Sequence, residues 1–108
     1  MRHISLATAA VIALSITTAQ ARDVIGGGSR SCGSWLENQR DEYFSLYDQA
    51  WVAGYLSSYS LHASDQIQLP DAAAVRGWIT KYCRNHPLDE IYKAADELVN
   101  ELNHRASH

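Results

Sequence analysis

The chain has 108 residues, with nine Lys and Arg against 12 Asp and Glu, so its formal charge at neutral pH is −3. This length suits one domain and is too short for two. No run of basic residues is present, which argues against nucleic acid or an anionic lipid surface as the main partner.

The first 21 residues are typical of a secretory signal peptide. A basic start at Arg2 precedes an apolar run over residues 4–16 and the small-x-small site Ala19-Gln20-Ala21. The apolar run is shorter than the ~20 residues that a membrane span needs. The sequence therefore predicts cleavage after Ala21, export to a bacterial periplasm and no stable membrane insertion afterwards; an uncleaved anchor is the alternative. Without Arg2 the mature chain has eight basic residues and a formal charge of −4.

Residues 22–31 show no periodicity and contain three consecutive glycines, so they predict a flexible lead-in to the domain. A phosphate-binding loop is the alternative, but the Lys-Ser/Thr pair that such a loop requires is missing. The pattern Ser34-Trp35-Leu36-Glu37 then resembles a capping box, in which Ser and Glu satisfy free amides at a helix start. It predicts a short first helix from Trp35 to about Glu42.

Aromatic residues recur at every fourth position of the next segment, which on a helix makes a slowly rotating stripe. This aromatic ladder comprises Tyr43, Tyr47, Trp51, Tyr55 and Tyr59. Two interpretations stay open: the ladder packs the core with its hydroxyls reaching the surface, or it is a protein-binding face. Gly54, which costs a helix about 1 kcal/mol relative to Ala, suggests that another helix crosses closely there.

Residues 62–70 lack periodicity and predict a loop before the third helix. That helix should run from Ala72 to about Asn85, capped by Asp71, with an apolar stripe formed by Val75, Trp78, Ile79, Tyr82 and Cys83.

Pro87 is predicted to open the last helix as its first residue, with Asp89 and Glu90 in the first turn. The apolar stripe of this helix comprises Leu88, Ile91, Ala95, Leu98, Val99 and Leu102. Strand patterns are absent. The predicted fold class is therefore all-α: one small bundle of about four helices over residues 32–103, with a polar tail over 104–108.

Cys32 and Cys83 are the two cysteines of the chain. In an oxidising compartment such a pair most simply forms a disulfide, and closing this loop should stabilise the fold by ~4 kcal/mol. A metal site that adds His86, or a redox pair, is the alternative, but only three ligands are in sight and no Cys-x-x-Cys is present. The prediction is a structural disulfide, with no metal and no cofactor.

No catalytic motif is recognisable, and the sequence predicts that the protein is not an enzyme. None of His62, His86, His104 and His108 has an adjacent Cys or Ser that suggests a nucleophile. His62 and Asp65 resemble half of a catalytic triad, but no serine completes it.

The segment Trp78-Ile79-Thr80-Lys81-Tyr82-Cys83-Arg84-Asn85-His86-Pro87 with Ile91-Tyr92 resembles the second-cysteine helix of the HdeA/HdeB family of periplasmic acid-stress chaperones. Ser31-Cys32-Gly33-Ser34-Trp35-Leu36 and Trp51-Val52-Ala53-Gly54-Tyr55-Leu56 resemble that family's two preceding helices. A weaker resemblance, through Gly54-Tyr55-Leu56, Tyr82…Pro87 and Ala95…Leu102, is to the immunity proteins that neutralise type VI secretion amidases. The first resemblance implies a helical, disulfide-tied chaperone, and the second implies a dedicated inhibitor.

Three functions follow as hypotheses. The first is an acid-stress chaperone that uses the ladder to bind clients. In the second, a dedicated inhibitor or adaptor binds one protein through the ladder, Asp48 and the loop over residues 62–68. The third is a structural envelope protein without a discrete ligand. A homodimer that buries part of the ladder is compatible with each of them.

Overall fold

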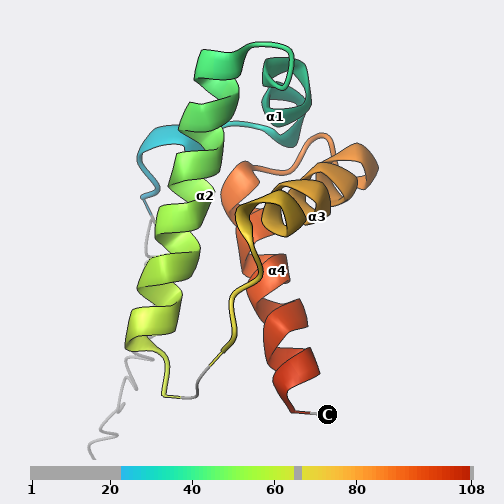
Figure 1. The fold of residues 1–108 in the computed structure, drawn as a ribbon. Helices are drawn as coiled ribbons and strands as arrows, with labels where there is room; N and C mark the ends of the chain where they lie inside the picture. The colour runs from blue at the N-terminus through green and yellow to red at the C-terminus, as the bar shows by residue number, and fades with distance from the viewer. Residues whose placement is uncertain (1–22, 65–66, 108) are drawn as a thin grey trace, which may run out of the picture.

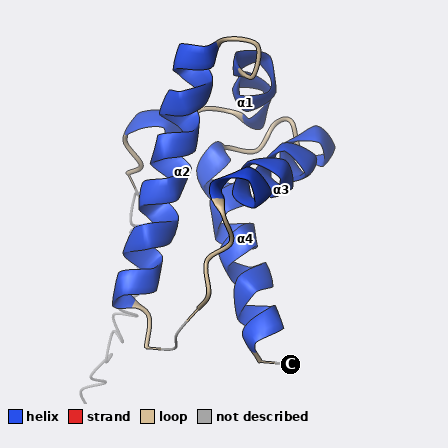
Figure 2. Ribbon diagram, in the orientation of Figure 1, coloured by secondary structure: helices blue, strands red, loops and turns tan. Residues whose placement is uncertain are grey.

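The computed structural model describes residues 23–64 and 67–107. It consists of α1 (Cys32–Asn38), α2 (Glu42–His62), α3 (Ala72–Asn85) and α4 (Ile91–Ala106), preceded by the short 3-10 helix η1 (Gly26–Ser29). The described part has no named strand (Figure 2). The predicted all-α bundle of about four helices is confirmed. The predicted signal peptide lies outside the described residues, and no described helix has the length and apolar character to cross a membrane.

The four helices pack around one shared core. α1 lies against α3, α2 runs along one side of the molecule from its upper end beside α1, and α4 packs against both α2 and α3 (Figure 1). The core takes buried side chains from all four helices, including Trp35, Val52, Ile79, Ile91 and Leu98. The apolar stripe predicted for α3 is confirmed, since Ile79 and Cys83 are buried and its other members pack against the core.

The start of α1 differs from the prediction. The helix begins at Cys32, and Ser31 is its N-cap, accepting a hydrogen bond from the Ser34 amide at 3.1 Å. The next free amides, those of Cys32 and Gly33, donate to carbonyl oxygens of the α3–α4 turn (residues 86–90) at 2.7 and 3.0 Å. The predicted start with a capping box at Ser34 is therefore wrong, because acceptors from a distant turn allow the helix to begin three residues earlier.

The turn between α3 and α4 also corrects the prediction for Pro87. α4 begins at Ile91 with Glu90 as its N-cap, so Pro87 lies before the helix. Leu88, predicted to join the apolar stripe, is 93% exposed in this turn. The carbonyl groups of the turn receive the α1 amides, which explains why this segment stays non-helical. At its other end α4 continues to Ala106, through the first residues of the predicted polar tail.

Part of the predicted lead-in forms a short 3-10 helix. Gly26–Ser29 form η1, which packs against α2 and α4. Gly28 is buried, and a Cβ there would come within 2.2 Å of the Trp51 ring. Only glycine allows the backbone to approach Trp51 this closely.

Gly54 is exposed, and nothing lies within 4 Å of the position that a Cβ would occupy. The close helix crossing predicted at Gly54 is therefore absent from the described part of the chain.

Candidate functional site

The aromatic ladder changes sides along α2 because of helix geometry. Each step of four residues advances about 400°, or about 40° beyond one full turn. Five residues therefore sweep from the outer face of α2 round to its core face. Tyr43 and Tyr47 are 73% and 47% exposed, whereas Trp51, Tyr55 and Tyr59 are half-buried against the core. The sequence left open whether the ladder is core or binding face. In the structure its first two residues are exposed and its last three pack against the core.

The inner ladder residues use their polar atoms to join α2 to other elements. The Trp51 Nε1–H donates to the Ile25 carbonyl at 2.8 Å. The Tyr55 hydroxyl donates to Asp96 on α4, and the Tyr59 hydroxyl accepts from Asn103 of α4 at 2.9 Å. This half of the ladder therefore holds α2 in place.

The outer ladder residues belong to an exposed apolar group at the N-terminal end of α2. We call it the α2 cluster; it comprises Tyr43, Phe44, Leu46 and Tyr47, all exposed. The Tyr43 and Phe44 rings meet edge to face with centroids 5.3 Å apart, and the Arg30 guanidinium lies 5.8 Å from the Phe44 centroid. Neither ladder tyrosine of this cluster has a hydroxyl hydrogen bond to another described residue.

Asp48 does not lie on a binding surface, and its predicted place in an interface is wrong. The residue is 1% exposed, since it points inward from α2 toward η1 and α1. Its Oδ2 accepts from the Asn38 Nδ2 at 3.1 Å, and its Oδ1 lies 3.7 Å from the Arg30 Nη1. Asp48 thus links three elements. The loop over residues 62–68 was predicted to belong to the same interface, and its residues 65 and 66 lie outside the described residues.

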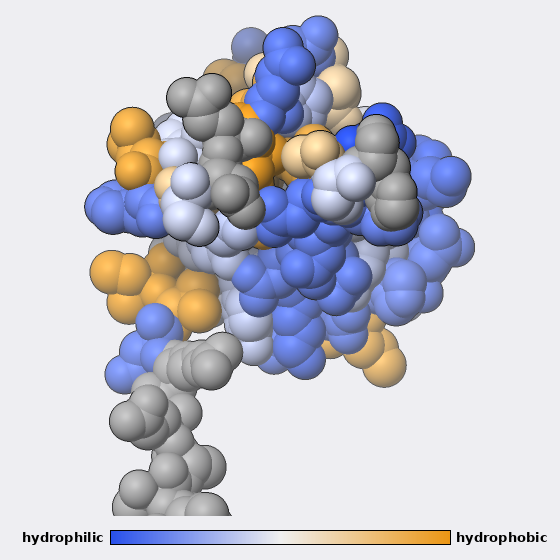
Figure 3. Space-filling view, turned by 90° about the horizontal axis from the view of Figure 1, so that it is seen from below, coloured by the Kyte–Doolittle hydropathy of each residue, from blue (hydrophilic) through white to orange (hydrophobic). Residues whose placement is uncertain are grey.

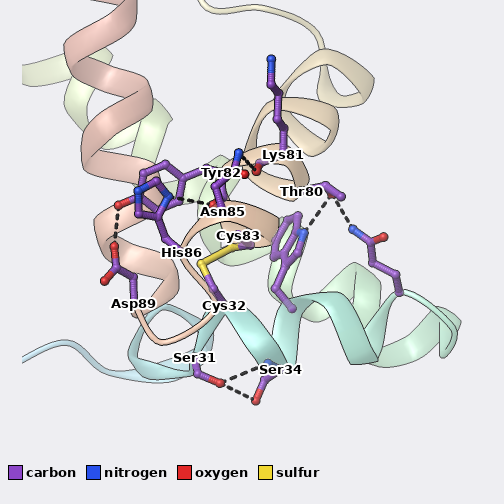
Figure 4. Close-up of a disulfide and its surroundings, with 12 residues drawn as sticks. Ser31, Cys32, Ser34, Thr80, Lys81, Tyr82, Cys83, Asn85, His86 and Asp89 are labelled. Carbon is purple, nitrogen blue, oxygen red and sulfur yellow. Dashed lines mark hydrogen bonds between the residues drawn. A yellow bond between two sulfur atoms is a disulfide. The ribbon is translucent and has the colours of Figure 1, made fainter.

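A second ladder on α3 was missed by the sequence analysis. Trp78, Tyr82 and His86 stack in turn, with ring centroids 5.7 and 4.2 Å apart. The Tyr82 hydroxyl donates to Asp89 at 2.6 Å (Figure 4), and this hydrogen bond is the main reason that the pKa of Tyr82 is raised to about 12. The spacing of four residues was visible in the sequence, but it was interpreted only as part of an apolar stripe.

The disulfide and two neutral hydrogen bonds join α1 to α3. Cys32 and Cys83 are bonded with their Cα atoms 4.7 Å apart, which confirms the predicted disulfide (Figure 4). The Thr80 hydroxyl accepts from the Trp35 Nε1 at 3.0 Å and from the Gln39 Nε2 at 2.5 Å. Within the described ranges no group of three or more His, Cys, Asp or Glu could hold a metal ion.

Two contacts of α2 with its neighbours use carboxylates, those of Asp48 and Asp96. Burial and the hydrogen bond to Asp96 raise the pKa of Tyr55 well above its ordinary value, which keeps the phenol protonated beside the carboxylate. Asp48 is the corresponding acceptor on the η1 and α1 side of α2. Two carboxylates, Asp48 and Asp96, therefore help to hold α2, whereas the disulfide and the Thr80 hydrogen bonds between α1 and α3 involve none.

Figure 3 shows the molecule from below, at the end where α2 finishes. Most of the described residues that are visible on this face are hydrophilic, and the hydrophobic ones form separate groups. The two predicted loop and turn histidines bond to backbone oxygens: His62 to Ser58 at 2.7 Å and His86 to Tyr82 at 3.0 Å. Asp65, paired with His62 in the sequence analysis, lies outside the described residues.

Comparison with protein-family models, with curated proteins and with solved structures found no match to this chain. The fold and the contacts above are therefore the basis for any assignment of function.

Proposed function

We propose that this chain is a non-enzymatic, exported protein-binding module of the HdeA/HdeB-like kind, with the α2 cluster as its binding surface. The observation that carries the proposal is the exposure of four adjacent large side chains at one end of α2: Tyr43, Phe44, Leu46 and Tyr47. Aromatic residues that combine apolar area with a free hydroxyl are enriched at the energetic centres of protein interfaces.

The rest of the molecule supports the α2 cluster as a rigid platform. The inner ladder residues fix α2 against α4 and the lead-in through Trp51, Tyr55 and Tyr59. Arg30 and Asp48 fix the end of α2 that carries the cluster. Binding side chains on a helix held in this way lose little conformational freedom when a partner binds.

The experiment is capture of partners with the tagged mature chain from periplasmic extract, followed by affinity measurement. Tyr47→Ala should weaken binding by more than about 1 kcal/mol without lowering the melting temperature. Leu88→Ala is the matched control, because Leu88 is exposed and apolar but lies outside the α2 cluster. Equal losses of affinity in the two variants, or a loss of stability in Tyr47→Ala, would contradict the proposal.

A second candidate is the acid-stress chaperone, favoured by the carboxylates that hold α2. The contacts of α2 through Asp48 and Asp96 use carboxylate acceptors, and a hydrogen bond to an ionised acceptor is about twice as strong as one to a neutral acceptor. The disulfide between α1 and α3 has no such charge to lose. A loosened α2 would add the inner ladder residues to the exposed cluster.

Capture at pH 7 and again at about pH 3 separates the two candidates. Many unrelated proteins recovered only in acid would support the chaperone. One stoichiometric partner at neutral pH would support a dedicated inhibitor or adaptor. A chain that stays compact and binds no hydrophobic dye in acid would reject the chaperone.

A further inference from the structure

A cavity of about 170 Å³ lies between α2 and α3, beside the core. Trp35, Val52 and Leu56 line it from the buried core, and half-buried Leu69 and Val75 line it from the loop and α3. An apolar cavity of about 150 Å³ can bind benzene instead of water. The volume and the lining therefore suit one apolar group of about the size of a benzene ring.

The lining of this apolar cavity also includes one cationic side chain, that of Arg76. Arg76 of α3 contributes to the lining and is exposed. It makes no ion pair or hydrogen bond to any other residue within the described ranges. A guanidinium binds a carboxylate through two parallel hydrogen bonds. Gln49 and Ser57 add polar groups from α2.

We propose that the cavity binds an apolar group that carries a carboxylate, with the apolar group among Trp35, Val52 and Leu56 and the carboxylate on Arg76. Such a group belongs to a free aromatic acid or to the C-terminal Phe of a polypeptide. The cavity uses a different side of α2 from the α2 cluster, because Val52 and Leu56 are buried whereas Tyr43 and Tyr47 face outward. The proposal is therefore independent of the protein-binding function.

The first test titrates the mature chain with 3-phenylpropionate and follows the indole N–H signals by NMR. The Trp35 Nε1–H, which donates to Thr80, should shift and saturate, while the signal of Trp78, which does not line the cavity, should stay unchanged. The uncharged 3-phenylpropionamide should bind at least about tenfold more weakly, because it cannot form a charge-assisted pair with Arg76. A shift that fails to saturate, or equal affinity for acid and amide, would overturn the proposal.

Two pairs of variants separate the roles of charge and space. Arg76→Gln should abolish the preference for acid over amide, and Arg84→Gln, also exposed on α3, should keep it. Ala53→Leu should fill part of the cavity and lower affinity at least about tenfold, whereas Ala50→Leu, exposed outside the cavity, should not. Unchanged affinity in Ala53→Leu would place the ligand elsewhere and overturn the proposal.

A last experiment shows whether the ligand is a polypeptide C-terminus or a free acid. It measures the affinities of a short peptide ending in Phe and of the same peptide with a C-terminal amide. Tighter binding of the free-carboxylate peptide than of 3-phenylpropionate supports a polypeptide C-terminus, and binding of 3-phenylpropionate alone supports a free acid. Tyr47→Ala should leave both affinities unchanged, so failure of the α2 cluster as a binding surface and failure of the cavity are observed separately.

Discussion

The α1–α3 contact and the contacts of α2 hold the same small core by different chemistry. α1 and α3 are joined by the Cys32–Cys83 disulfide and by neutral hydrogen bonds to Thr80. α2 is held through Asp48 on one side and through the Tyr55–Asp96 hydrogen bond on the other.

Because of this difference, a change of pH should affect the contacts of α2, whereas a reducing agent should affect the contact between α1 and α3. A disulfide is unaffected by protonation, while a charge-assisted hydrogen bond weakens when its carboxylate is neutralised. α2 carries every residue of the aromatic ladder, so the pH-sensitive contacts are also those that control how much of the ladder is covered.

Breaking the disulfide should have the largest effect. Cys32→Ser with Cys83→Ser removes a bond that closes a separation of 51 residues, and the free energy of unfolding should fall by ~4 kcal/mol. The loss should be the same at pH 7 and at about pH 5, because the disulfide and the Thr80 hydrogen bonds involve no carboxylate. Urea unfolding at both values measures it, and a loss that depends on pH would contradict the separation of the two contacts.

Removing the Thr80 hydroxyl should have the next largest effect. Thr80→Val leaves the buried Trp35 Nε1–H without its acceptor, which costs about 2 kcal/mol. Like the loss of the disulfide, this cost should not vary with pH. The same urea measurements test it, with Ser58→Ala, at an exposed position of α2, as the control. Equal losses of stability in the two variants would show that the Trp35–Thr80 hydrogen bond does not hold α1 to α3.

The sequence predicted most of the fold because local patterns determine the helices. The apolar stripe of α3 and the cap at Asp71 both have their cause within a few residues, and both match the structure. The start of α1 and the position of Pro87 were wrong because their cause is a pair of backbone hydrogen bonds between segments more than 50 residues apart. Local patterns do not contain such contacts.

The candidate site was predicted less completely. A spacing of four residues identifies the ladder but does not reveal which end faces the core, because that depends on where α4 and η1 pack. Asp48 shows the same difficulty, since a charged residue on a helix is usually exposed and this one is buried by its pairing with Arg30 and Asn38. No pattern in the sequence predicts the cavity beside Arg76, because its lining residues come from separate elements.

Removing one hydroxyl from the α2–α4 contact should give a smaller, pH-dependent effect. Tyr55→Phe loses the hydrogen bond to Asp96 and should lower the free energy of unfolding by about 1 kcal/mol at neutral pH. The loss should shrink as the pH rises above 10.0, because burial and the hydrogen bond to Asp96 raise the pKa of Tyr55 in the folded state, and the contribution of this group to stability is lost there. Urea unfolding of wild type and variant on both sides of this pH measures the difference. A constant loss would show that the Tyr55–Asp96 hydrogen bond does not retain the phenol proton.

Tyr82→Phe should have the smallest effect on the free energy of unfolding at neutral pH. Its effect should become visible at alkaline pH. The pKa of Tyr82 is raised to about 12 from 10.0, so the folded state favours the protonated phenol. The contribution of this group to stability is therefore fully present below pH 10 and is lost as the pH rises towards about 12. Wild type should lose stability across this window more steeply than Tyr82→Phe. Near-ultraviolet absorbance of the phenolate should show one fewer late-titrating tyrosine in the variant. Identical titration curves would mean that the Tyr82–Asp89 hydrogen bond does not retain the proton.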